Sequence, residues 1–199
     1  MKLEKFISVF FHPVFIPLIT VFLVIKKYSN IIVLENQAAL ILIGTFIFTL
    51  ILPLLSVLIL ILSKKVEGLE MHKKEERFFP LLFAFISISI GFYYLKELLD
   101  YAPIMKSIYL GALYILIPPI LITKIWKISL HMLAIGGATG VFFMLELLFG
   151  QNLNLLLISI FISGMLGYSR FSLQAHSLTQ IYTGFILGNA IMCLSIIYL

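Results

Sequence analysis

The chain has 199 residues, of which 62% are hydrophobic and 12% are charged, and its mean hydropathy is +1.15. Soluble globular domains contain roughly 45–50% apolar and about 25% charged residues, so this composition excludes a water-soluble enzyme, a disordered chain and a free nucleic-acid-binding protein. The formal charge of +5 then reflects cytoplasmic loops and contacts with anionic lipid.

The apolar residues fall into runs that are close to the length of about 20 residues needed to cross a bilayer. These runs lie at residues 6–25, 38–62, 78–95, 104–123, 128–149, 153–168 and 177–199. The first run contains Pro13 and Pro17 and lacks a small-residue cleavage site, so we interpret it as a retained helix and not as a signal peptide. The small residues at 136–140 predict close packing between helices.

The connections between the runs are short, and they contain no Gly/Ser linker or internal repeat. The sequence therefore predicts an all-α, polytopic integral membrane helix bundle with six to seven transmembrane helices. We expect a single membrane domain over residues 1–199, and the expected location is the inner (cytoplasmic) membrane of a bacterium.

The polar residues gather at one side of this predicted bundle. If the spans alternate in direction, the ends of the second, fourth and sixth runs face the same compartment, and these ends carry the polar segments 63–77, 124–131 and 169–176. The three segments contain His72, His131 and His176. Ionisable residues that converge at the margin of a membrane bundle are candidates for function.

Two histidines among arginines and lysines suit the chemistry of phosphate. Arginine binds phosphate oxygens bidentately, and helix N-termini offer free N–H groups. One histidine would attack phosphorus while the other protonates the departing oxygen. Ser129 is placed to cap the helix that carries His131.

The order and spacing of these residues resemble the type 2 phosphatidic acid phosphatases over roughly residues 64–190. The third motif of that family is Ser-Arg-x5-His-x3-Asp, and here Ser169-Arg170 is followed after five residues by His176. The second motif is Pro-Ser-Gly-His, of which Ser129 and His131 keep the serine and the histidine. The phosphatase-like core would cover about residues 64–199, and the helices at 6–62 would be additional.

The first motif of the family is Lys-x6-Arg-Pro, and it corresponds to the segment that ends at Arg77. Pro80 follows three positions later, and Glu70 occupies the position of the lysine, so Lys73 or Lys74 is the candidate replacement.

The resemblance implies a bundle of about six membrane helices that hydrolyses lipid phosphates without a metal or a cofactor. It makes His176 the phosphate-accepting nucleophile and His131 the general acid, with Gln180 at the position of the family's orienting aspartate. The implied phosphate-binding residues are Arg77, Arg170, Ser129, Ser169, Lys73 and Lys74.

Among the differences from the family motifs, Gln180 in place of aspartate has the clearest chemical consequence. It lies four residues after His176, so both side chains share one face of a helix. The amide carbonyl accepts the imidazole N–H and selects its tautomer, but it supplies no negative charge. In serine proteases the same exchange of carboxylate for amide lowers kcat by about 10⁴. Three possibilities follow: Glu75 or Glu76 supplies the charge, the enzyme is slow, or activity has been lost.

We therefore expect a membrane phosphatase that hydrolyses the phosphomonoester or diphosphate of a lipid or polyprenyl substrate through a phosphohistidine intermediate. The alternative is a catalytically inactive relative that binds or transports phosphorylated lipid. The expected partners are phosphorylated lipid and membrane lipids, with no nucleic acid, and the oligomeric state stays open. An intramembrane protease built on Glu75-Glu76 is disfavoured because Arg77 follows at once, and no HxxxH or HExxH spacing indicates a metal site.

Two observations disagree about which side the site faces. Ten of the 14 lysines and arginines fall on the side of the polar segments, namely Lys2, Lys5, Lys64, Lys65, Lys73, Lys74, Arg77, Lys124, Lys127 and Arg170. The positive-inside rule then places the site at the cytoplasm, whereas the resemblance implies the opposite face. Both orientations stay open.

Overall fold

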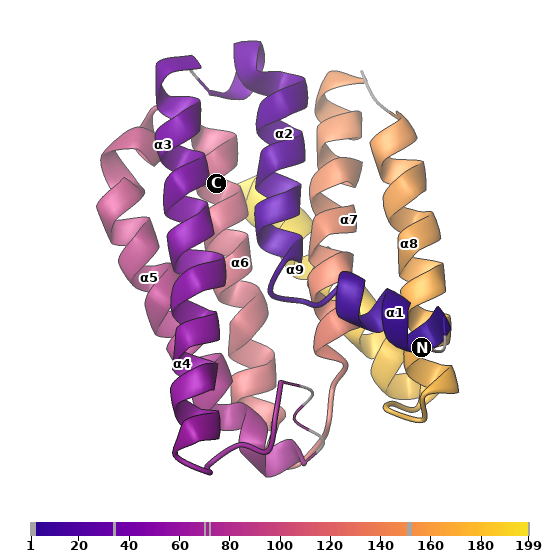
Figure 1. The fold of residues 1–199 in the computed structure, drawn as a ribbon. Coiled ribbons are helices and arrows are strands. Elements are labelled where there is room, and N and C mark those ends of the chain that lie inside the picture. The colour runs from indigo at the N-terminus through magenta and orange to yellow at the C-terminus, as the bar shows by residue number, and fades with distance from the viewer. Residues whose placement is uncertain (1–2, 34, 70, 72, 151–152, 199) are drawn as a thin grey trace.

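A computed structural model of the chain describes residues 3–33, 35–69, 71, 73–150 and 153–198. Figure 1 shows an upright bundle of helices. Its elements are α1 (Leu3–Phe10), α2 (Ile16–Ile32), α3 (Glu35–Thr45), the π-helical turn η1 (Phe46–Ile51), α4 (Leu52–Leu62), the 3-10 turn η2 (Lys74–Arg77), α5 (Phe78–Asp100), α6 (Pro103–Ile122), α7 (Leu130–Phe149), α8 (Leu153–Ser172) and α9 (Leu178–Tyr198).

Within the described residues, six helical segments are long and apolar enough to cross a membrane. They are Gln37–Leu62, Lys74–Asp100, Pro103–Ile122, Leu130–Phe149, Leu153–Ser172 and Leu178–Tyr198. Large apolar side chains such as Ile59 and Phe161 are exposed on the outer faces of these helices, as expected for surfaces that contact lipid. The predicted all-α integral membrane bundle is therefore confirmed.

The first apolar run is not the single helix that the sequence predicts. α1 ends at Phe10, and a turn leads into the 17-residue α2 at Ile16. Proline has no N–H to donate, and it disfavours the helical conformation of the preceding residue. Pro13 therefore ends the first helix, whereas Pro17 is tolerated in the first turn of α2. As a result α1 leaves the axis of α2 and packs on α8 (Figure 1).

The second predicted run is one continuous span with a local irregularity. Between α3 and α4, the N–H of Leu52 donates to the carbonyl of Ile47, five residues back, in the π-helical turn. Pro53 follows directly, and its missing N–H disturbs the regular ladder there. Thr45 and Thr49 donate their hydroxyls to carbonyls four residues back, so the side chains of this turn are satisfied within the helix.

α7 is the central helix, and it packs against α2, α6, α8 and α9. Its contact with α9 depends on glycine: a Cβ at Gly136 would lie 2.3 Å from the Phe185 carbonyl oxygen, and one at Gly188 would lie 2.1 Å from the Leu133 carbonyl oxygen. The prediction of close packing through small residues is confirmed. The contact also brings the two helix starts together.

Replacing Gly188 by alanine is expected to separate α7 and α9. The new methyl group would meet backbone, which cannot rotate away, so we expect the free energy of unfolding to fall by about 1–3 kcal/mol. Thermal unfolding in detergent measures this. Gly164→Ala on α8 is the matched control, because a Cβ there meets nothing within 4 Å. Equal stability of the two variants would contradict the glycine contact.

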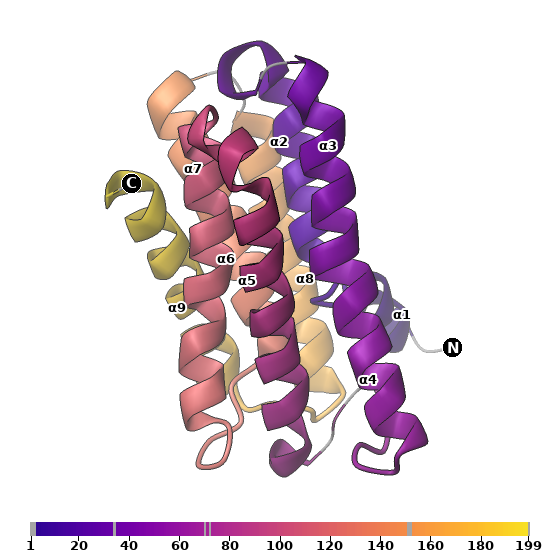
Figure 2. The same cartoon turned by 90° about the vertical axis from the view of Figure 1, so that its left-hand side faces the viewer.

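The polar connections gather at one end of the bundle. The connections after α4, after α6 and after α8 lie at the lower end in both views (Figures 1 and 2). These connections lead into the segments of Arg77, His131 and His176, so the structure confirms that the three predicted polar segments share one side.

Candidate active site

Four basic side chains converge at this end of the bundle. Arg77 and Arg170 are each only 5% exposed, and His176 is 6% exposed. Burial, Arg77, Arg170 and Lys127 together lower the pKa of His176 to about 4, although the hydrogen bond to Gln180 Oε1 raises it. Burial, Arg77 and Arg170 also lower the pKa of Lys127. The imidazole therefore lies in a cationic environment suited to an anion.

Arg77 is fixed by two backbone carbonyls from different connections. Its Nη1 donates to the Ile128 carbonyl at 3.0 Å, and its Nε donates to the Met71 carbonyl at 3.2 Å. These bonds join the connection before α5 to the connection before α7. The guanidinium is thereby held at the place where the two polar segments meet.

His176 is oriented by Gln180 in a single tautomer. Gln180 Oε1 lies 3.0 Å from His176 Nδ1 and 3.2 Å from the backbone nitrogen of Ser177. A backbone N–H can only donate, so the amide atom that faces it is the oxygen, and His176 Nδ1 must carry the hydrogen. His176 Nε2 is left with its lone pair, which is the form that a nucleophile requires.

The start of α9 explains why glutamine suits this position structurally. The Gln180 N–H faces the Ser177 hydroxyl at 3.4 Å while the Gln180 side chain reaches back to the Ser177 N–H. This reciprocal arrangement is a capping box, Ser-x-x-Gln. Before it, Gln174 adopts a left-handed conformation with φ of 51°, and the Ala175 N–H donates to the Arg170 carbonyl at 3.1 Å. The turn folds the chain back to the end of α8.

α1 contributes a residue that the sequence motifs do not indicate. The Ser8 carbonyl lies 3.1 Å from His131 Nε2, and Arg170 Nη1 donates to the Ser8 hydroxyl. A carbonyl can only accept, so His131 Nε2 carries a hydrogen in this arrangement. The His12 ring lies 5.4 Å from the His131 ring, centroid to centroid. Ser8 thus links the candidate acid to a candidate phosphate ligand.

The two motif serines have backbone partners. Ser129, which is completely buried, accepts the Met132 N–H at 3.5 Å and caps α7 as predicted. Ser169, also completely buried, donates its hydroxyl to the Glu4 carbonyl at 2.6 Å and so fixes α1 against α8. Both serines hold helices in place around the cationic cluster.

The resemblance suggested Lys73 or Lys74 as the phosphate-binding lysine, and the structure brings a further lysine, Lys127, near His176 and the two arginines. Lys73 is exposed and pairs with Glu67, and the backbone carbonyl of Lys74 accepts the Thr123 hydroxyl at 3.3 Å. Lys127 belongs to a polar segment that the sequence identified, but no motif singled it out. Glu70 and His72 lie outside the described residues.

Among the described residues, the groups that shift the pKa of His176 are Arg77, Arg170, Lys127 and Gln180, and neither Glu75 nor Glu76 is one of them. In this conformation neither Glu75 nor Glu76 supplements the amide with a carboxylate at His176.

We expect His176 to titrate near pH 4. Its pKa in the folded chain lies below the ordinary value of 6.5, so the ring is neutral at pH 7 and gains a proton only as the pH falls through about 4. Histidine-ring NMR in detergent, with the His176 signal assigned by substitution, measures the midpoint. A midpoint near 6.5 would contradict the cationic environment.

A recess of about 520 Å³ lies beside His176 at the polar end of the bundle. Its walls are the end of α8 and the connection to α9, and they comprise Tyr168, Phe171, Ser172, Gln174, His176 and Ser177. Among the described residues, no group of three or more His, Cys, Asp or Glu is arranged to hold a metal ion. Comparisons with family models, with curated proteins and with solved structures found no match to this chain.

Proposed function

We propose that the chain is a membrane phosphatase that hydrolyses the phosphomonoester or diphosphate of a lipid or polyprenyl substrate through a phosphohistidine intermediate. The observation that carries this proposal is the state of His176. Gln180 holds the hydrogen on Nδ1, so the Nε2 lone pair is available, and three cations lie close enough to lower the pKa of the ring. A neutral nucleophile among fixed positive charges is complementary to a phosphate group.

The chemistry divides between the two histidines. The lone pair of His176 Nε2 attacks phosphorus, the bond from phosphorus to the lipid oxygen breaks, and His131 transfers a proton to that oxygen. The negative charge of the bound phosphate favours the protonated form of His131 that this step needs. In the second step water attacks phosphorus while the now neutral His131 accepts a proton from it, and the bond from phosphorus to His176 Nε2 breaks. Inorganic phosphate and free His176 are released, and His131 is protonated again.

Arg77, Arg170 and Lys127 would bind the phosphate oxygens and stabilise the charge that develops on them. Arg170 now donates to the Ser8 hydroxyl, so a phosphate oxygen would take the place of that hydroxyl as acceptor. The recess beside His176 would admit the water for the second step.

Phosphate release by the detergent-purified chain tests the proposal. We expect release from at least one member of a panel of phosphatidate, phosphatidylglycerol phosphate and polyprenyl phosphates and diphosphates. The release should persist with EDTA and disappear in an Arg170→Met variant. A folded chain that releases no phosphate from any member would overturn the proposal.

The second candidate is an inactive relative that binds or transports phosphorylated lipid. Gln180 favours it, because an amide completes the capping box but adds no negative charge to support a developing imidazolium. A binding protein of this kind would retain labelled lipid phosphate and leave the phosphate ester intact.

Lys127→Met is expected to lower kcat/KM by about tenfold, since one hydrogen bond to a charged group contributes about 1.5 kcal/mol. Lys124→Met is the matched control: Lys124 is exposed, and its Nζ lies 4.9 Å from the centre of the Phe78 ring. Steady-state phosphate release measures both variants. Equal activities would remove Lys127 from the phosphate site.

A further inference from the structure

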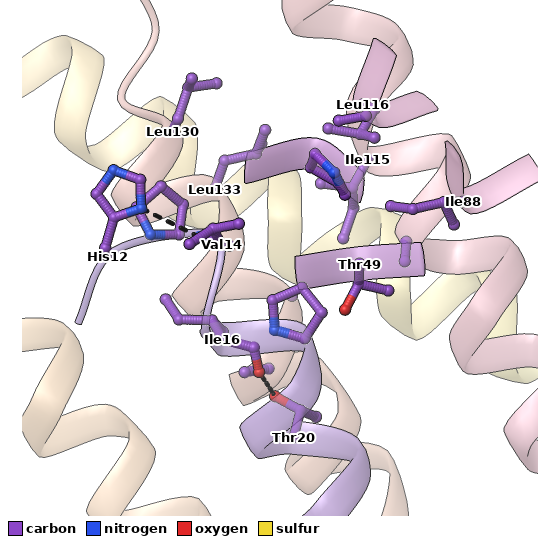
Figure 3. A pocket seen from close by; sticks show the side chains of 18 of the residues that line it. His12, Val14, Ile16, Thr20, Thr49, Ile88, Ile115, Leu116, Leu130 and Leu133 are labelled. Carbon is purple, nitrogen blue, oxygen red and sulfur yellow. Dashed lines mark hydrogen bonds between the residues drawn. The ribbon is translucent and has the colours of Figure 1, made fainter. Parts of the chain in front are cut away.

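A cavity of about 200 Å³ lies between the N-terminal helices and the core of the bundle. α2, the α3–α4 span, α5, α6 and α7 all contribute side chains to its walls. Figure 3 shows His12, Val14 and Leu130 on one side of it and Ile88 and Leu116 on the other. An apolar cavity of 150 Å³ in a protein interior already stays dry and binds benzene, so this one is large enough for a segment of hydrocarbon.

The walls offer almost no hydrogen bonds to an occupant. The hydroxyl of Thr20 is donated to the Ile16 carbonyl at 2.8 Å, and those of Thr45 and Thr49 are donated within their own helix. The Tyr109 hydroxyl pairs with that of Thr45. The remaining lining is apolar apart from His12, so the chemistry selects an apolar chain and not a polar solute.

One end of the cavity borders the cationic cluster. Leu130 lines the cavity and precedes His131, and the His12 ring contacts the His131 ring. Met71 also lines the cavity, and its carbonyl accepts the hydrogen bond from Arg77. A phosphorylated lipid whose chain lies in the cavity would therefore present its head group to positive charge.

The cavity matches the length of one leaflet of a bilayer. Its α7 wall runs from Leu130 to Val141, which is about 16 Å at 1.5 Å per residue. Half of the bilayer hydrocarbon core is about 15 Å. The wall is therefore about as long as the part of an acyl chain that lies in one leaflet.

We propose that this cavity binds one acyl chain of the phosphorylated lipid substrate, and that the N-terminal helices serve to build it. This inference rests on the proposed function, because only that function identifies the head group as a phosphate. α2 and the α3–α4 span lie outside the region that resembles the phosphatases, and without them the cavity would lose one wall. The substrate class is then an acyl lipid phosphate, and the cavity selects the length of its chain.

A chain-length series tests this assignment. The substrates are monoalkyl phosphates from hexyl to octadecyl, and the variant is Ala112→Phe, which fills the cavity from α6. Ala39→Phe is the matched control, because Ala39 is exposed on α3 and does not line the cavity. We expect Ala112→Phe to lower kcat/KM for octadecyl phosphate by about tenfold and to leave hexyl phosphate within about twofold. Comparing proteins at one chain length cancels partitioning of the substrate into detergent.

Binding of a fluorescent fatty acid gives a readout that needs no catalysis. We expect Ala112→Phe to weaken this binding by about tenfold while Ala39→Phe binds as the unmodified chain does. Ala84→Phe, on the α5 wall, replaces Ala112→Phe if that variant does not fold.

The two readouts separate the outcomes. Loss of chain binding in a protein that releases no phosphate would support the cavity and overturn the phosphatase. Phosphate release whose dependence on chain length is the same in Ala112→Phe, or in its replacement Ala84→Phe, as in the unmodified chain would support the phosphatase and overturn the cavity. Displacement of the probe by unphosphorylated alcohols as strongly as by alkyl phosphates would overturn the pairing of cavity and head-group site.

Discussion

His176→Ala is expected to lower the rate of phosphate release by at least about 10⁴. The variant loses the only protein atom that forms a bond to phosphorus in the proposed reaction. Removal of a nucleophile in a cooperating set typically costs a factor of this size or larger. Steady-state release from the best lipid phosphate, with EDTA present, measures the loss.

The control for this prediction is His176→Asn. The asparagine amide can donate to Gln180 Oε1 as Nδ1 does now, so the turn before α9 should keep its structure while the nucleophile is absent. We expect His176→Asn to unfold at the temperature of the unmodified chain and to be as inactive as His176→Ala. Substantial activity in either variant would exclude His176 as the nucleophile.

Gln180→Glu is expected to raise kcat by about tenfold or more. A carboxylate beside His176 Nδ1 stabilises the imidazolium character that develops as Nε2 bonds to phosphorus. Glutamate also serves in a capping box, so the start of α9 should be preserved. The same charge raises the pKa of His176, and the acidic limb of the pH profile should move upward from about pH 4.

Gln174→Glu is the matched control for the added charge, because Gln174 belongs to the same connection and does not bond to His176. Gln174 lines the recess beside His176, so we expect this variant to change kcat by much less than Gln180→Glu does. Gln180→Asp restores the residue of the resembling family with a shorter side chain. Unchanged or lower turnover in both Gln180 variants would show that the amide is no deficit.

The membrane fold could be predicted from the sequence because each span is a long apolar run that ends at a polar segment. The failure at residues 6–25 has a physical cause: hydropathy does not distinguish one helix from two that are broken at Pro13. What directs α1 onto α8 is a set of tertiary bonds, from Ser169 to Glu4 and from Arg170 to Ser8. Such partners are more than 160 residues apart, and no local pattern records them.

In the candidate site too, neighbouring residues could be paired from the sequence, whereas contacts between distant residues could not. The sequence pairs His176 with Gln180, and the structure gives 3.0 Å between them, but the expected reason, one shared helix face, is wrong. α9 begins at Leu178, so His176 precedes the helix, and the capping box of Ser177 and Gln180 turns the Gln180 side chain back toward it. Ser8 lies 123 residues from His131, and nothing in its neighbourhood marks it. Lys127 was passed over for Lys73 and Lys74 because family spacing pointed to the first motif, whereas the folded connections bring Lys127 to the arginines.

Trapping the covalent intermediate tests the central proposal most directly. The purified chain would be mixed with lipid phosphate labelled in the phosphate group, quenched within its first turnover and mapped by mass spectrometry. We predict an acid-labile, base-stable phosphate on His176 Nε2 that forms in the unmodified chain and is absent from His176→Asn. Phosphate release without any labelled protein, or a label on another residue, would contradict the phosphohistidine mechanism.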